Sequence, residues 1–200
     1  MLQCTRYIVF QRKNAKIGMV RKNPFSTKFW TSGIIPFQFS ESSENISTLM
    51  ERMRRQPICQ IVGPHGSGKS TLLLELLRQH EQNGEKVCLL FFNDQHRRIP
   101  GDVAFQDSPL FFVDGFEQLS PADRLRLLFR AKHLVLTAHR PVWFVPVLYR
   151  TNPQFLIFAQ IVQHLVSQPH DESVLRTVYE RSGGNFRTAF FELYDQWEVQ

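Results

Sequence analysis

One short stretch of the sequence has the residue types and spacing needed to hold the phosphates of a nucleotide. Its residues fit the pattern G-x-x-x-x-G-K-[ST] and are Gly63, Pro64, His65, Gly66, Ser67, Gly68, Lys69 and Ser70. The glycines let the backbone curl so that several N–H groups point at one anion. We expect Lys69 to reach the β- and γ-phosphates and the Ser70 hydroxyl to ligate Mg²⁺. Thr71, the next hydroxyl, is expected to pack or to contact the α-phosphate.

The elements beside this loop are those that such binding requires. Residues 58–62 (ICQIV) are apolar and predict a buried strand. Residues 70–83 have leucines at helical spacing, and Gly84 then ends the expected helix. A helix that starts at the loop adds its partial positive charge to the phosphate site. The combination predicts a protein that binds Mg-ATP, with ATP and Mg²⁺ as its cofactors.

An acidic residue ends another expected strand. Residues 85–94 and 109–114 (PLFFVD) both predict strands, and the latter ends in Asp114. Beside a phosphate loop, an acid at this position can hold Mg²⁺ through water. The pattern resembles the Walker B motif of phosphate-loop NTPases, in the branch that includes AAA-type and ABC ATPases. Over residues 43–200 the resemblance implies an α/β fold, a three-layer core with a mostly parallel five-stranded sheet and a small C-terminal helical lid.

The residue after Asp114 departs from the pattern of that branch. A Glu that orients the attacking water usually stands there, whereas this chain has Gly115. Glu117 is the nearest replacement, and a flexible turn at Gly115 would let its carboxylate swing inward. Hydrolysis of ATP therefore depends on Glu117. The alternative interpretation of Glu117 is a solvated carboxylate in the first turn of a helix.

Polar residues also lie at the end of a fourth expected strand, residues 133–138. The resemblance implies a sensor of the γ-phosphate here, which is a polar residue in AAA-type ATPases and a His in ABC ATPases. Thr137 and His139 both qualify by position. Arg140 follows them, either as a phosphate contact, as an arginine finger or as a surface residue.

The path to a fifth expected strand, residues 145–150, is short. A parallel return usually takes a dozen or more residues through a helix, and here only residues 140–144 intervene. The return is therefore either an extended crossover or an antiparallel edge strand. Pro141 and Pro146 suit an edge strand, and both alternatives remain open.

The C-terminal part predicts three helices, over residues 153–167, 171–182 and 186–197. A Gly-Gly-Asn-x-Arg turn precedes the last of them. This turn resembles the lid of the origin-recognition and secretion-ATPase branches of AAA-type proteins. There, an arginine at the start of the last lid helix contacts the γ-phosphate, and in this chain that residue is Arg187. The alternative is a surface arginine beside a helix-capping turn.

The N-terminal quarter carries the positive charge. The net charge is +6, and residues 1–56 hold ten Lys and Arg against three Asp and Glu. Such a segment would attract DNA or a protein partner, and the alternative is a solvated tail. Residues 23–39 predict an irregular strap that packs its Phe and Trp side chains on the domain. A second interpretation makes this strap a wall for an adenine ring.

Composition limits the class of protein. With 42% hydrophobic and 21% charged residues in 200, the chain is globular, which excludes a disordered, collagen-like or coiled-coil chain. Cys4, Cys59 and Cys88 show no CxxC spacing, which indicates reduced thiols, no zinc site and a cytoplasmic location. No apolar run approaches the roughly 18 residues of a membrane span.

Together these features predict a basic extension and strap at residues 1–42, an ATPase core at 43–151 and a helical lid at 152–200. The predicted function is slow Mg-ATP hydrolysis coupled to lid motion, in a mechanical or regulatory role. One alternative is a nucleotide-gated, DNA-associated switch with little turnover. Another is a small-molecule or nucleoside kinase, although the chain lacks an Arg-rich kinase lid. Many AAA-type ATPases need an arginine from a neighbouring subunit to complete the site. The resemblance therefore also implies a homo-oligomer as an expectation.

Overall fold

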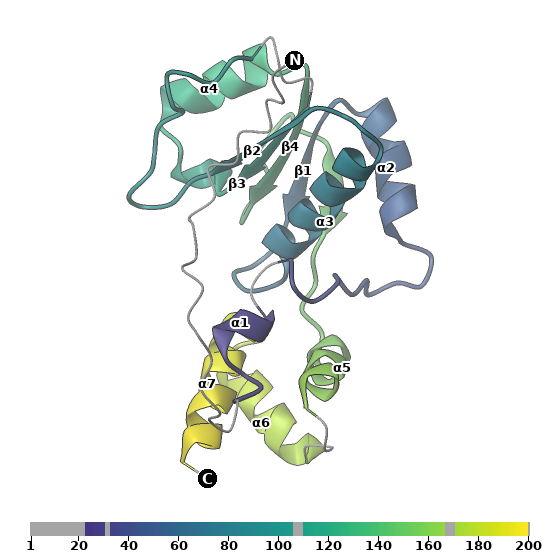
Figure 1. Cartoon of the computed structure of the whole chain (residues 1–200), viewed down its shortest axis with the longest axis vertical. Coiled ribbons are helices and arrows are strands. Elements are labelled where there is room, and N and C mark those ends of the chain that lie inside the picture. Colours follow the sequence, from purple (N-terminus) through teal and green to yellow (C-terminus); the bar gives the residue numbers. More distant parts are fainter. Residues whose placement is uncertain (1–22, 31–32, 106–109, 167–170, 200) are drawn as a thin grey trace.

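The computed structural model describes residues 23–30, 33–105, 110–166 and 171–199 of the chain (Figure 1). Its helices and strands follow one another in the order α1 (Thr27–Trp30), α2 (Ile46–Arg55), β1 (Ile58–Val62), α3 (Lys69–Gln82), β2 (Val87–Phe91), β3 (Leu110–Asp114), the 3₁₀ turn η1 (Phe116–Gln118), α4 (Pro121–Arg130), β4 (His133–Ala138), β5 (Val147–Arg150), α5 (Phe155–Leu165), α6 (Glu172–Arg181) and α7 (Phe186–Glu198).

The five strands form one parallel sheet in the order β2-β3-β4-β1-β5. This confirms the predicted α/β class and the five-stranded sheet. Because all strands run the same way, their carboxyl ends meet at one edge, where ligands of open α/β sheets bind. The residues after β1, β3 and β4 are therefore brought to one edge of the sheet.

The return from β4 to β5 is an extended crossover, which answers the question that the sequence left open. β5 pairs in parallel with β1, so the antiparallel alternative is excluded. The side chain of Gln60, on β1, is fully buried beneath this segment. It donates to the carbonyl oxygens of Val142 and Val145 at 2.9 and 2.5 Å and accepts from the Val142 N–H at 2.8 Å. These bonds satisfy backbone groups that a helix would have paired internally.

Apolar clusters lie on both faces of the sheet. On one face α2 and α3 bury leucines and methionines against it, as the predicted helical spacing required. On the other face α4 contributes Leu127, which is fully buried. Helical spacing predicts Leu125, Leu128 and Phe129 as the buried face of this helix. Leu128 does pack against the cluster, but the prediction was wrong for the other two residues, since Leu125 is 53% and Phe129 84% exposed. The reason is the rotation of α4, because Arg124, one turn before Leu127, turns inward to bind backbone carbonyls.

A third cluster joins α5, α6 and α7 to the N-terminal strap. The strap contains the short helix α1, which lies beside α7 in Figure 1. Asn23 donates to the Tyr194 carbonyl at 3.1 Å and to the Glu198 carboxylate at 2.8 Å. The Trp30 ring stacks on Phe190 with centroids 5.1 Å apart. Segments from the two ends of the chain therefore pack as one unit.

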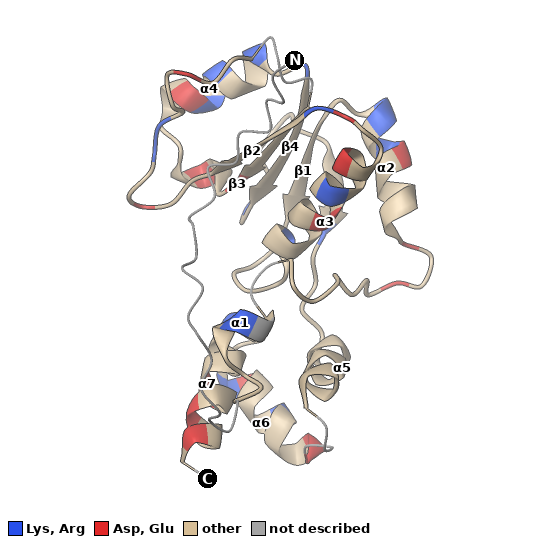
Figure 2. Cartoon of the chain, viewed as in Figure 1, with Lys and Arg blue, Asp and Glu red and all other residues tan. Residues whose placement is uncertain are grey.

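Charged side chains of both signs are interspersed over α2, α3, α4, α6 and α7, whereas α5 carries none (Figure 2). On α2, for example, Glu51 pairs with Arg54 and Arg55 at 3.3 and 3.0 Å. Of the basic segment predicted to bind DNA or a protein, residues 1–22 lie outside the described residues. Within the described part of the chain, no helix has the length and apolar character to cross a membrane.

Candidate active site

The phosphate loop leads from β1 into the first turn of α3, as predicted. Gly66 and Gly68 have φ angles of +70° and +87°, values that residues with a Cβ rarely adopt. Gly68 caps α3, whose first residue is Lys69. The loop therefore takes its curved form from glycines and places the start of a 14-residue helix at the site.

Lys69 is turned back onto its own loop. Its ammonium group donates to the carbonyl oxygens of Gly63 and Pro64 at 2.7 and 2.6 Å, and Nζ lies 3.2 Å from Nδ1 of His139. The pKa of Lys69 is lowered to about 8, mainly by burial; the charges of Glu117 and Asp114 oppose this change, and the charge of Arg187 adds to it to a smaller extent. A phosphate anion at this position would favour the charged ammonium.

Asp114 ends β3 beside the loop, and Thr137 orients it. The Thr137 hydroxyl donates to Asp114 Oδ1 at 2.6 Å and accepts from the Gly115 N–H at 3.0 Å. Asp114 and Ser70 line the same cavity. A carboxylate and a hydroxyl oxygen are ligands that Mg²⁺ accepts, so these residues fit the predicted metal site.

Glu117 lies in the turn η1 and contacts His139. Its Oε1 is 2.8 Å from His139 Nε2, while its Oε2 is buried and has no hydrogen-bond partner among the described residues. The Arg124 guanidinium donates to the carbonyl oxygens of Glu117 and Leu119 and so fixes the turn. Gly115 begins the turn at φ +77°, and a Cβ there would overlap the Phe92 carbonyl oxygen. The local backbone therefore explains why a glycine, not a Glu, follows Asp114.

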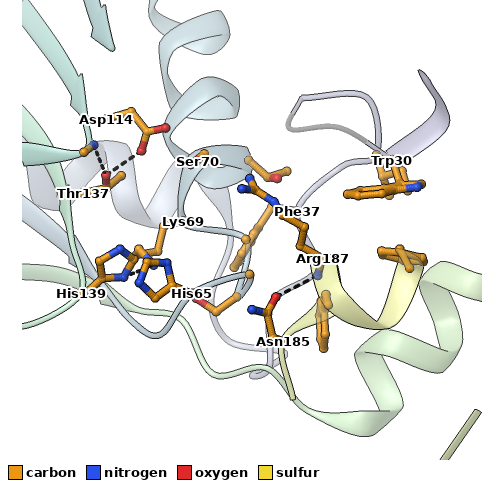
Figure 3. A pocket seen from close by; sticks show the side chains of 18 of the residues that line it. Trp30, Phe37, His65, Lys69, Ser70, Asp114, Thr137, His139, Asn185 and Arg187 are labelled. Carbon is orange, nitrogen blue, oxygen red and sulfur yellow. Dashed lines mark hydrogen bonds between the residues drawn. The ribbon is translucent and has the colours of Figure 1, made fainter. Parts of the chain in front are cut away.

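Two histidines cover the loop on this side (Figure 3). The His65 and His139 rings pack against each other with centroids 3.5 Å apart and planes inclined at 36°. Burial, and then the charges of Lys69 and His65, lower the pKa of His139, whereas Glu117 raises it. Arg140 is exposed and is not among the residues that line the cavity, so its role as an arginine finger stays a prediction.

The start of α7 closes the site from the other side. Asn185 caps α7 by accepting from the Arg187 and Thr188 N–H groups at 3.1 and 3.3 Å. Gly66 lies so close that a Cβ on it would be 2.7 Å from Asn185 Cγ. The Arg187 side chain extends into the cavity that the phosphate loop lines (Figure 3). The C-terminal turn therefore rests directly on the loop.

These parts enclose a cavity of about 740 Å³. The predicted residues that line it are His65, Gly66, Ser67, Gly68, Lys69, Ser70, Thr71, Asp114, Glu117, Thr137, His139 and Arg187. Gly63 and Pro64 contribute through their carbonyl oxygens, which bind Lys69. Away from the phosphate loop the wall is apolar and aromatic and includes Trp30, Phe37 and Phe190. Such a wall suits a flat ring.

A family model described as an AAA domain matches residues 52–178. The chain belongs to the AAA-domain family. It is thus a nucleotide-binding protein with a phosphate loop, as the resemblance implied. A comparison with curated proteins found no match. In this AAA domain the match includes the loop, Asp114, Glu117 and His139 but ends before Asn185 and Arg187.

Sequence reasoning missed Thr151 and did not single out Phe37, and both residues shape the site. The Thr151 hydroxyl lies 2.6 Å from that of Ser67, and a Cβ on Gly63 would overlap it. Phe37 lies against Gly68, where a Cβ would be 3.1 Å from its ring. Thr151 directly follows β5, so its position at the carboxyl edge of the sheet could have indicated it. Phe37 belongs to the strap of residues 23–39, whose second interpretation was a wall for an adenine ring, and its place in the cavity lining agrees with that interpretation.

Proposed function

We propose that this AAA domain binds and slowly hydrolyses Mg-ATP, and that turnover is coupled to movement of α5–α7 as a lid. One observation supports this most directly. The phosphate loop, Asp114 after β3 and Arg187 at the start of α7 all line one cavity. A core element and a C-terminal element therefore face the same ligand position.

Each residue has a role in this proposal. Lys69 and the loop N–H groups bind the phosphates. Ser70 and Asp114 hold Mg²⁺, which neutralises charge on the phosphate oxygens when bound. Glu117 orients the attacking water, and Arg187 contacts the γ-phosphate. Each of these side chains lines the cavity, which supports the assignment.

Coupling to the lid follows from differential attraction. Arg187 belongs to α7, and the γ-phosphate adds negative charge that ADP lacks. ATP therefore stabilises the arrangement in which α7 rests on the loop more than ADP does. A ligand that distinguishes two positions of a helical unit shifts their populations, which suits a mechanical or regulatory output.

The test measures nucleotide binding and phosphate release in parallel. We expect Lys69→Ala to weaken ATP binding roughly ten- to hundredfold, since a charged hydrogen bond contributes ~1.5–3 kcal/mol. Glu117→Gln should bind ATP normally and release little phosphate. Lys86→Ala, at an exposed position, is the matched control and should behave as wild type. Chelation of Mg²⁺ should lower ATP affinity in wild type. Normal ATP binding by Lys69→Ala would contradict the assignment of the loop.

A second candidate is a nucleotide-gated switch with little turnover, and Gly115 favours it because no Glu follows Asp114. Tight ATP binding with no phosphate release by wild type would identify this function. If the switch acts on DNA, deletion of residues 1–22 should remove a salt-sensitive DNA affinity. This deletion keeps residues 23–30, which pack on α7.

A further inference from the structure

His139 joins the lysine of the phosphate loop to Glu117 through its two ring nitrogens. Nδ1 lies 3.2 Å from Lys69 Nζ, and Nε2 lies 2.8 Å from Glu117 Oε1. The Gly63 carbonyl oxygen is also near Nδ1, at a longer 3.4 Å. One imidazole ring therefore contacts both a group that binds phosphate and the carboxylate expected to orient water.

The partners of the ring define its tautomer. The Lys69 ammonium can only donate, so Nδ1 accepts from it. Nε2 then carries the hydrogen and donates to the Glu117 carboxylate. The surroundings favour this neutral form, because burial and the charges of Lys69 and His65 lower the pKa of His139, although Glu117 and the Gly63 carbonyl oppose them. The His65 ring packs against the imidazole, with centroids 3.5 Å apart and planes inclined at 36°, and so restrains its position.

Glu117 needs such a partner because of where it lies. It is three residues beyond Asp114, in the turn η1, so the end of β3 does not hold its carboxylate. Arg124 fixes the backbone of this turn but does not contact the carboxylate. Among the described residues, the carboxylate contacts His139 through Oε1, and Oε2 has no hydrogen-bond partner. The direction of the Glu117 side chain therefore depends on this ring.

We propose that His139 is a positioning residue whose Nε2–H holds Glu117 at the phosphate site and whose Nδ1 ties this pair to Lys69 while the site is free of phosphate. The proposal rests on the proposed ATPase function. The phosphates of a nucleotide attract the Lys69 ammonium away from Nδ1. The bond to Glu117 does not involve Lys69, so it persists, and the His139–Glu117 pair is then free to turn toward the nucleotide.

Two amide variants of His139 distinguish the role of Nε2 from the role of Nδ1. In His139→Gln the amide lies near the position of Nε2, so the donor to Glu117 is kept and the acceptor for Lys69 is lost. In His139→Asn the amide lies near the position of Nδ1 and is too short to reach Glu117. We expect His139→Gln to retain phosphate release that His139→Asn loses, roughly tenfold or more. His139→Asn combined with Glu117→Gln should be no slower than Glu117→Gln alone.

The matched controls are His133→Gln and His133→Asn, at an exposed position at the start of β4. ATP affinity, measured with a fluorescent ATP analogue, should change less than about threefold in both His139 variants. Equal losses of phosphate release in the two variants would overturn the proposal. A loss of ATP affinity without a loss of turnover would also overturn it, because His139 would then bind phosphate directly.

A second measurement does not need hydrolysis. NMR of protein with ¹⁵N-labelled histidine reports the tautomer, and the His139→Gln variant assigns the signal. We expect Nε2–H at His139 in free protein, a change at Nε2 in Glu117→Gln and a change at Nδ1 when ATP is added. An Nδ1–H tautomer or an imidazolium near neutral pH would overturn the proposal. Wild-type protein that binds ATP without releasing phosphate would overturn the proposed hydrolysis, and the NMR result then decides this inference separately.

Discussion

Replacing Gly66 by Ala tests whether the contact between the phosphate loop and α7 organises the site. Gly66 has φ +70°, and a Cβ on it would overlap Asn185 Oδ1 and lie 2.7 Å from its Cγ and 3.2 Å from the Arg187 backbone nitrogen. Gly84 is a matched position, with φ +78° and no atom within 4 Å of the added Cβ. The two variants share a backbone cost and differ in the contact with α7.

The expected magnitudes follow from these two terms. The left-handed backbone costs a residue with a Cβ about 1–2 kcal/mol, and Gly84→Ala should lose this amount alone. Gly66→Ala should lose a further ~1–3 kcal/mol, because Asn185 and the start of α7 have to move. Displacing Arg187 would remove its proposed charged contact with the phosphates, so ATP affinity should fall roughly ten- to hundredfold.

Urea unfolding and titration with a fluorescent ATP analogue measure the two effects. Asn185→Gly removes the overlapping side chain while keeping an acceptable helix cap. In the double variant Gly66→Ala/Asn185→Gly, part of the lost stability and ATP affinity should return, as a coupling energy between the two positions. The reasoning fails if Gly66→Ala matches Gly84→Ala in both assays. It also fails if Asn185→Gly restores nothing, since the loss would then lie within the loop alone.

Three further predictions concern other parts of the site and the core. Thr137→Val should destabilise the fold by about 1–3 kcal/mol in urea unfolding, because Asp114 and the Gly115 N–H lose their hydrogen-bond partner. It should also weaken ATP binding more in the presence of Mg²⁺ than in the presence of a chelator. Thr137→Ser, which keeps the hydroxyl, should retain both the stability and the Mg²⁺-dependent ATP binding. Arg124→Met should lower phosphate release but not ATP affinity, because it frees the turn that carries Glu117, and an equal fall in both would contradict this role. Burial raises the pKa of Cys59 from 9.0 to about 12. The contribution of the protonated thiol to the free energy of unfolding is fully present below pH 9. Above pH 9 it declines by up to ~1.4 kcal/mol per pH unit, because the thiol ionises more readily in the unfolded chain. The destabilisation caused by Cys59→Ala should therefore shrink between pH 8 and pH 10.5.

Much of the core could be predicted because its signals are local. The glycine loop, the strand that precedes it and the strand that ends in Asp114 depend on residues close together in sequence. The parallel sheet followed from the resemblance. The path from β4 to β5 could not be predicted, because it depends on Gln60, more than 80 residues away in the chain, which binds Val142 and Val145.

The finer geometry of the site needed tertiary information. Helical spacing indicated that α4 is amphipathic but not its rotation, which Arg124 sets by binding the turn before it. Likewise, Thr137 and His139 were equivalent by position in the sequence. In the structure the Thr137 hydroxyl is bound to Asp114 and the His139 ring faces Lys69 and Glu117, because β4 ends at Ala138 and His139 lies beyond it, where the alternation of the strand no longer sets the direction of a side chain.

The packing of α1 on α7 gives the C-terminal helices two attachments to the sheet. One runs through residues 33–45 to α2, and the other runs from β5 through residues 151–154. A body on one linker can swing in many directions, whereas a body held at two points turns mainly about the line that joins them. In the proposed lid movement, Arg187 would therefore be displaced mainly in one direction. Because Trp30 stacks on Phe190, a force applied to α1 would reach the phosphate site from outside the cavity.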